Sequence, residues 1–185
     1  MRLLTFRDRE LPATLRSRIL AAHRDEWPHG YDGELEGRTW IQRPWFHPNH
    51  VVLVDDDRLI AYAGVVWKDL AHGGETYRTS GLSGVITLPA FRRHGHARRV
   101  VEAATTLIRA SDADIGLLTC APSLTGFYAA HGWEEIVGTA LFGGPARAPT
   151  REWTEAVMMG FFSDKGRAAR EAFAAQPIFF DDDLW

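Results

Sequence analysis

The chain has 185 residues, 45% apolar and 24% charged, a composition typical of a globular domain that buries its own core. Its formal net charge of −3 gives no general attraction to nucleic acid or to a membrane surface. The single cysteine, Cys120, excludes an internal disulfide, and the charged N-terminal stretch has no apolar signal core. We therefore expect one cytoplasmic domain over residues 1–185, with neither a nucleic acid nor a membrane as its partner.

The first half of the chain predicts a strand, a helix, a long loop and a hairpin. The helix is indicated by the amphipathic spacing of Leu15, Ile19 and Leu20, and the hairpin by two β-rich runs around an acidic turn. In chain order, these elements are a strand at 2–6, a helix at 11–27, a loop at 28–50 with a short helix near Glu34–Gln42, and paired strands at 51–54 and 59–67.

The second half alternates strands and helices. In chain order, its expected elements are a strand at 77–88, a helix from about 95 to 110, a strand at 115–120, a helix at 122–133, strands within 134–142 and 155–162, and a helix at 165–175. The helices interrupt a series of strands that short turns connect. This order predicts an α+β fold, a three-layer sandwich with a mixed, mostly antiparallel sheet flanked by helices.

A basic stretch, "RRHGHA" at Arg92–Ala97, lies where the strand at 77–88 leads into the following helix. The start of a helix offers unpaired main-chain N–H groups, and Gly95 would let an anion approach them closely. The stretch lacks both the Lys-Ser/Thr pair of a Walker loop and the glycine pattern of a dinucleotide fingerprint. On this local pattern alone, a phosphate site and a solvated basic face both remain open.

Two motifs together resemble the GCN5-related N-acetyltransferases, over about residues 81–133. "RRHGHA" matches the family's R/Q-x-x-G-x-G/A loop, and "FYAAHGW" at Phe127–Trp133 is similar to its F/L-Y-x-x-x-G-F/W signature. The resemblance implies the acyl-CoA N-acyltransferase fold, with acetyl-CoA as co-substrate and no metal. It implies the following cofactor-binding residues: Val85, Ile86, Thr87, Arg92, Arg93, His94, Gly95, His96 and Ala97.

The same resemblance implies direct transfer of the acetyl group, with Tyr128 as the general acid. A phenol of pKa ~10 is protonated at neutral pH and can donate to a departing thiolate. Tyr128 as a core or coenzyme-packing residue is the alternative. The main-chain N–H near Ile86 or Thr87 would polarise the thioester carbonyl. Cys120 ends a strand but has no visible basic partner, which argues against a nucleophilic role.

The C-terminal "FFDDDLW" is similar to the end of the aminoglycoside 2'-N-acetyltransferases, a branch of the same family. This likeness implies a small cationic amine as substrate, with the tail 176–185 docked near the acceptor site; a frayed acidic tail is the alternative. The substrate-binding residues that it implies are Asp32, Ser83, Gly84, Thr119, Glu152, Asp183 and Trp185.

Ser83 departs from the pattern, because those enzymes carry a glutamate base at this catalytic position. A serine hydroxyl is no general base, so deprotonation would run through water to His47, His50 or Glu152, or the acceptor differs from the common drugs. Kasugamycin is one such acceptor. Another small amine, a peptide N-terminus, and a CoA-binding module without turnover are the alternatives. The eight histidines show no metal-binding spacing, and the resemblance allows a homodimer.

Overall fold

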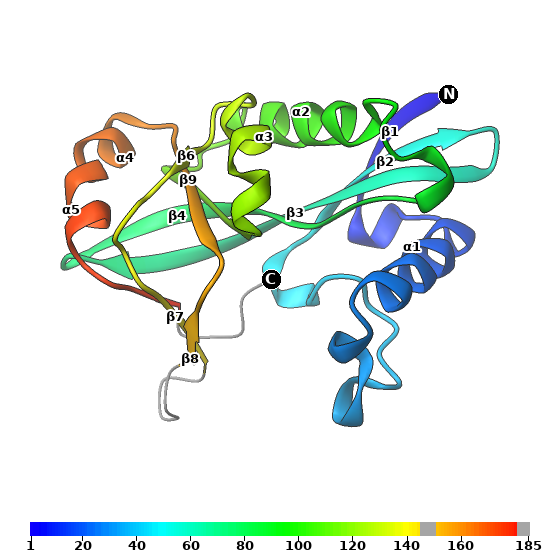
Figure 1. Cartoon of the computed structure of the whole chain (residues 1–185), viewed down its shortest axis with the longest axis horizontal. Coiled ribbons are helices and arrows are strands. Elements are labelled where there is room, and N and C mark those ends of the chain that lie inside the picture. Colours follow the sequence, from blue (N-terminus) through cyan, green and yellow to red (C-terminus); the bar gives the residue numbers. More distant parts are fainter. Residues whose placement is uncertain (145–150, 181–185) are drawn as a thin grey trace. The chain divides into compact units, whose positions relative to one another are not determined.

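The computed structural model describes residues 1–144 and 151–180 (Figure 1). The chain divides into two compact units. The first unit contains Met1–Val66 and Leu82–Thr105, and the second contains Trp67–Gly81 and the chain from Thr106 onward. Two long strands, β3 (Arg58–His72) and β4 (Glu75–Thr87), and the helix α2 (His96–Arg109) contribute residues to both units.

The first unit is built on antiparallel strands with one long helix. Its elements are β1 (Arg2–Arg7), α1 (Ala13–Glu26), β2 (Asn49–Asp55), the first part of β3, the last part of β4 and the start of α2. Short 3-10 turns lie at Asp8–Glu10, Pro28–Tyr31, Gly33–Leu35, Pro44–Phe46 and Pro89–Phe91. β2 pairs with β1 on one side and with β3 on the other, both antiparallel, which confirms the predicted hairpin.

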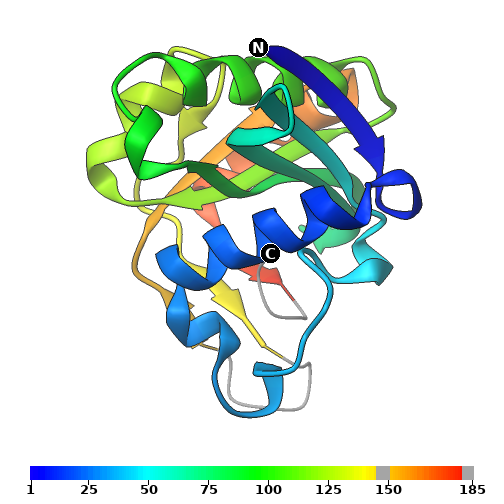
Figure 2. The same ribbon diagram turned by 90° about the vertical axis from the view of Figure 1, so that its right-hand side faces the viewer.

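The core of this unit forms where α1 packs on the strands, and Figure 2 shows α1 lying across them. Leu15 and Ile19, four residues apart in their helix, are buried with Val52 and Ile86 from the strands. Ile19 is fully buried, and removing such a side chain from water contributes about 1.5–3 kcal/mol. The amphipathic pattern of α1 therefore fixes which of its faces meets β4.

The second unit contains the end of a seven-stranded sheet and a separate three-stranded sheet. Its remaining elements are β5 (Ile115–Cys120), α3 (Thr125–Ala129), β6 (Glu134–Glu135), β7 (Leu141–Gly143), β8 (Arg151–Trp153), β9 (Ala156–Phe161), α4 (Asp164–Ala168), α5 (Arg170–Ala175) and β10 (Ile178–Phe180). The first part of β4 pairs with β5 in parallel, whereas β5 and β6 both pair antiparallel with β9. The seven-stranded sheet has the order β1-β2-β3-β4-β5-β9-β6, and the three-stranded sheet has the order β10-β7-β8.

The parallel β4–β5 pair explains the position of α2. Parallel neighbours need a crossover connection, usually a helix, and α2 is the helix that joins them. Its residues Val100, Val101, Ala104 and Ile108 are fully buried, as their helical spacing predicts. The mixed, mostly antiparallel sheet with flanking helices confirms the predicted fold class.

Several predicted boundaries are wrong. The short helix expected over 34–42 does not form; Gly33–Leu35 is a 3-10 turn instead. The helix expected over 122–133 is reduced to α3 with one preceding turn, and the last helix divides at Ala169 into α4 and α5. β3 runs five residues further than expected, to His72. No helix in the described part of the chain is long and apolar enough to span a membrane.

Candidate active site

The basic stretch forms a tight turn that opens α2. Arg93 and Gly95 both have left-handed backbone angles, with φ of 65° and 75°. Such an angle is costly for arginine and free for glycine. Among the residues that the structure describes, none accepts a hydrogen bond from the main-chain N–H groups of residues 93–97. The turn therefore presents a row of unpaired N–H donors at the positive end of a 14-residue helix.

Two buried polar atoms next to this turn also lack a partner. Thr87 Oγ1, at the end of β4, and His96 Nδ1, at the first residue of α2, make no hydrogen bond. Buried polar groups are nearly always satisfied, so each of these atoms calls for a ligand group. Arg92, in contrast, is already engaged, since it donates to Glu26 Oε2 at 2.6 Å and to the Thr87 carbonyl at 3.0 Å. Arg92 thus fixes the turn against β4.

Ser83 and Gly84 lie on β4 beside a histidine of α1. The His23 Nε2–H donates to the Gly84 carbonyl at 3.1 Å, which leaves Nδ1 as the ring acceptor. Gly84 has φ of 57°, and a Cβ there would collide with the His23 ring and lie 3.1 Å from Gln42 Nε2. Only glycine fits this close approach. Ser83 is buried, so its hydroxyl is not exposed to solvent.

Burial lowers the pKa of His23 to about 4, partly offset by its bond to Gly84, and the nearby Arg38 charge lowers it further. The imidazole is therefore neutral at neutral pH. It serves as a fixed hydrogen-bonding group rather than as a proton store.

The buried residue His50, one of the candidate proton acceptors, has both ring nitrogens engaged. Its Nε2–H donates to Asp8 Oδ1 at 3.0 Å, and its Nδ1 accepts from the Tyr62 hydroxyl at 2.9 Å. Gln42 in turn hydrogen-bonds to that hydroxyl. Burial lowers the pKa of His50 despite the Asp8 carboxylate. Because this network is complete, His50 has no free lone pair for a substrate proton, and its part in deprotonation would require breaking these bonds.

The second unit carries the candidate acid. Tyr128 lies on α3 with 7% of its surface exposed, and burial raises its pKa to about 12, with Cys120 and Glu155 adding to the effect. Burial also raises the pKa of Cys120 to about 11. Both groups are thus protonated at neutral pH. A protonated thiol is a poor nucleophile, and a protonated phenol is a competent donor.

Comparison with known proteins identifies the family. Residues 8–136 match the family model described as the acetyltransferase (GNAT) domain. The chain belongs to the GNAT acetyltransferases. The match spans α1, β4, the turn at Arg92–Ala97 and α3, so the two motifs lie inside it. No curated protein matches the sequence.

Solved GNAT structures share the fold at low sequence identity. An acyl-CoA N-acyltransferase from Pseudomonas aeruginosa is 15% identical with a TM-score of 0.59, over 86% of this chain and 98% of that one. An aminoglycoside 6'-N-acetyltransferase in complex with coenzyme A is 15% identical with a TM-score of 0.57, over 88% and 98%. A probable N-acyltransferase from Enterococcus faecalis V583 is 12% identical with a TM-score of 0.57, over 72% of this chain but only 33% of its own length.

These findings support an acyl-CoA N-acyltransferase, and the GNAT fold binds acetyl-CoA. The unpaired donors at the turn and the two orphaned polar atoms fit a diphosphate-bearing coenzyme. Val85 and Thr87 are half-buried and Ile86 is buried on β4, directly before this turn. Within the described residues, no group of three or more His, Cys, Asp or Glu side chains could hold a metal ion.

The residues predicted to bind the acceptor substrate lie on several different elements. Asp32 is exposed and lies 3.4 Å from His29, and Thr119 is half-buried on β5, opposite Val157 of β9. Asp183 and Trp185 lie outside the described residues, and only the backbone of Glu152 is described, in β8. Sequence reasoning missed His23, although its four-residue spacing from Ile19 already places it on the buried face of α1.

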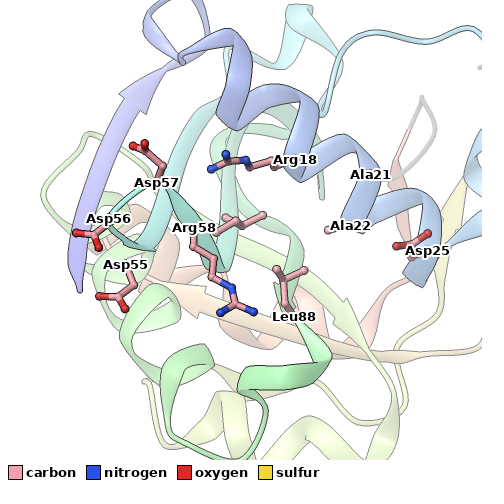
Figure 3. A pocket seen from close by; sticks show the side chains of 10 residues that line it. Arg18, Ala21, Ala22, Asp25, Asp55, Asp56, Asp57, Arg58 and Leu88 are labelled. Atoms are coloured by element: carbon pink, nitrogen blue, oxygen red, sulfur yellow. The ribbon is translucent and has the colours of Figure 1, made fainter.

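A separate shallow pocket of about 820 Å³ lies in the first unit, between α1 and the β2–β3 turn (Figure 3). Arg18 from α1 points toward Asp57 of the turn, Asp25 lies at the opposite end of the pocket, and Arg58 extends toward Leu88. None of the predicted cofactor or acceptor residues lines this pocket. This pocket is therefore distinct from the predicted coenzyme and acceptor residues on β4 and in the turn that follows it.

Proposed function

We propose that this GNAT protein transfers the acetyl group of acetyl-CoA to a primary amine of a small acceptor. The observation that carries the proposal is the row of unpaired main-chain N–H groups between Arg93 and Ala97 at the start of α2. Such a row binds phosphate groups through hydrogen bonds and the helix dipole. The coenzyme diphosphate supplies the matching charge, and Thr87 Oγ1 and His96 Nδ1 are further polar partners for it.

In the proposed reaction, the neutral amine nitrogen attacks the thioester carbonyl carbon, so that a C–N bond forms and the C–S bond breaks. The main-chain N–H at Ile86 or Thr87 stabilises the negative charge that develops on the carbonyl oxygen. Tyr128 donates its proton to the departing thiolate, the acetylated nitrogen releases a proton to solvent, and the tyrosinate regains one from solvent. Its raised pKa, about 12, keeps it in the donating form at every physiological pH.

The amine loses its proton to solvent in this scheme. Ser83 is no base, His23 has a pKa near 4, and both nitrogens of His50 are already engaged. The transfer rate therefore depends on the fraction of acceptor that is already neutral, and it rises with pH up to the pKa of the acceptor amine.

For the acceptor, we propose an aminoglycoside, with kasugamycin as one candidate and the 2'-amino group as the predicted position. The proposal is supported by the likeness of the C-terminal "DDDLW" to the aminoglycoside 2'-N-acetyltransferases. We further propose that the tail 176–185 lies near the acceptor, and that the activity gives resistance to the drug. Another small amine or a peptide N-terminus is the alternative for the same chemistry.

The test is thiol release from acetyl-CoA by the purified protein, measured with a thiol reagent against a panel of aminoglycosides, polyamines, amino acids and short peptides. Release that depends on an aminoglycoside supports the proposed acceptor class. Thiol release with other amines, but with no aminoglycoside, would support acetyl transfer and exclude an aminoglycoside as the acceptor. Coenzyme binding without release from any amine would show a CoA-binding module instead.

A further inference from the structure

We propose that the acceptor carries a carboxylate, which Arg38 binds. This inference rests on the proposed function and defines its substrate more narrowly. Arg38 belongs to the segment between α1 and β2 and is half-buried. Its guanidinium lies 3.7 Å from the ring centre of Tyr31 and 4.7 Å from that of Trp40. Contacts with two aromatic rings hold the planar group in place before any ligand binds.

The polar atoms of this cluster are unsatisfied. Arg38 Nε and the Tyr31 hydroxyl are both buried without a hydrogen-bond partner, and Tyr31 is 94% buried, since 6% of its surface is exposed. Among the described side chains, no carboxylate lies within ion-pair distance of Arg38. A buried N–H and a buried hydroxyl without partners are costly, and an anion that accepts from both removes that cost.

A second positive charge increases the need for an anion. Arg24, on the last turn of α1, lies 5.2 Å from the same Tyr31 ring. Two guanidinium groups on one ring repel each other, and a carboxylate beside them would relieve this repulsion. Asp32 and Glu36, acids of this segment whose side chains are described, are both exposed, and Asp32 lies 3.4 Å from His29 instead. Among its described side chains, the segment thus presents a positive charge without a carboxylate partner, where the sequence suggested a cation-binding surface.

The cluster also adjoins the acceptor position on β4. The charge of Arg38 reaches His23, which donates to the Gly84 carbonyl at 3.1 Å. Trp27 packs edge-on against His23 with ring centres 5.1 Å apart. An acceptor whose amine lies at Ser83–Gly84 would therefore place a nearby carboxylate at Arg38. A flat guanidinium edge matches the two oxygens of a carboxylate better than an ammonium of lysine could.

The experiment compares amines that differ in a carboxylate, in wild type, Arg38→Gln, Arg38→Lys and the control Arg18→Gln. The probe pairs are L-lysine with cadaverine, L-phenylalanine with phenethylamine, and kasugamycin, which has a carboxyl group, with kanamycin, which has none. We expect the carboxylate member of at least one pair to have the higher kcat/KM. Arg38→Gln should lower that value about 10- to 100-fold, mostly through KM, and Arg38→Lys should restore it only in part. The carboxylate-free partner and the Arg18 control should be unaffected.

Turnover of carboxylate-free amines only, or an equal loss for both members of a pair in Arg38→Gln, would overturn the inference and leave the proposed function intact. If no amine is acetylated, calorimetric titration of the three carboxylate compounds in the presence of coenzyme A decides. Binding that Arg38→Gln abolishes would support the carboxylate site while the transfer proposal fails. Absence of binding to any of the three would overturn the site as well. Circular dichroism of each variant checks its fold.

Discussion

The pKa of His23 gives a measurable link between the β4 site and stability. The ordinary pKa of histidine is 6.5, and burial lowers that of His23 to about 4. Between these values the unfolded chain binds more protons than the folded one, so the free energy of unfolding falls as the pH falls. The full loss below pH 4 is about 3 kcal/mol, and about 2 kcal/mol of it should already be present at pH 5.

The perturbation that isolates this contribution is His23→Gln, which keeps a donor for the Gly84 carbonyl and does not titrate. Urea unfolding at pH 7.5 and 5.0, followed by tryptophan fluorescence, should show wild type losing about 2 kcal/mol more than the variant over this interval. The pKa of His50 is lowered in the same direction, but His50 is present in both proteins, so its contribution cancels in the difference.

The matched control is His29→Gln, because the His29 side chain is 96% exposed. It should follow wild type at both pH values. If wild type and His23→Gln lose the same free energy on acidification, the imidazole is not held in its neutral form, and burial does not control its pKa. An NMR titration of the His23 ring gives the same answer directly, with a pKa near 4 expected and a value near 6.5 contradicting it.

Three further changes test other parts of the structure. Tyr128→Phe should lower kcat about 10- to 1000-fold with little effect on KM. The wild-type rate should show no descending limb up to pH 10, because the pKa of Tyr128 is about 12; a fall near pH 9 would indicate a different acid. Gly95→Ala, at φ of 75°, should raise KM for acetyl-CoA about tenfold at unchanged kcat, and an unchanged KM would remove the turn from coenzyme binding. Gly166→Ala should destabilise the protein by about 2–3 kcal/mol in urea unfolding, because its Cβ would collide with the Asp114 carbonyl, whereas Gly37→Ala meets no atom and should behave as wild type.

The elements that the sequence predicted are those whose pattern is local. α1, the β2–β3 hairpin, α2 and β9 each show their period within a few residues, and all four form close to the predicted bounds. The error at β3 has a tertiary cause: Lys68 and Asp69 break the apolar pattern, yet the strand continues. The ammonium of Lys68 lies 4.4 Å from the ring centre of Phe180, a contact that no local pattern reveals.

The candidate active site also has a part that is local in sequence and a part that depends on tertiary contacts. The turn at Arg92–Ala97 is contiguous in sequence, so its glycine and its position were enough to predict a turn that opens a helix, while its role in binding the coenzyme stays a prediction. The environment of Gly84 is not contiguous, because it depends on His23, which is 61 residues away and belongs to another element. From the sequence, His47 and His50, on either side of Asn49, are candidate proton acceptors. His50 nevertheless belongs to a complete buried network, and the neutral imidazole beside β4 belongs to α1.

Acceptor charge is the point at which composition and structure lead to different inferences. The acids around residue 32 and at the C-terminus suggest a cationic ligand, because the sequence does not show which carboxylates are exposed or already paired. In the folded segment, however, the exposed Asp32 lies beside His29, while Arg38 is fixed between two rings with a buried, unpaired Nε. The half-buried guanidinium of Arg38, which has no carboxylate partner among the described side chains, is less screened by water than the exposed Asp32 carboxylate, so it interacts more strongly with a ligand. The amine and the anion of the acceptor would then be recognised by different groups, the amine at β4 and the anion at Arg38. We therefore expect the protein to prefer a zwitterionic acceptor over a polycationic one.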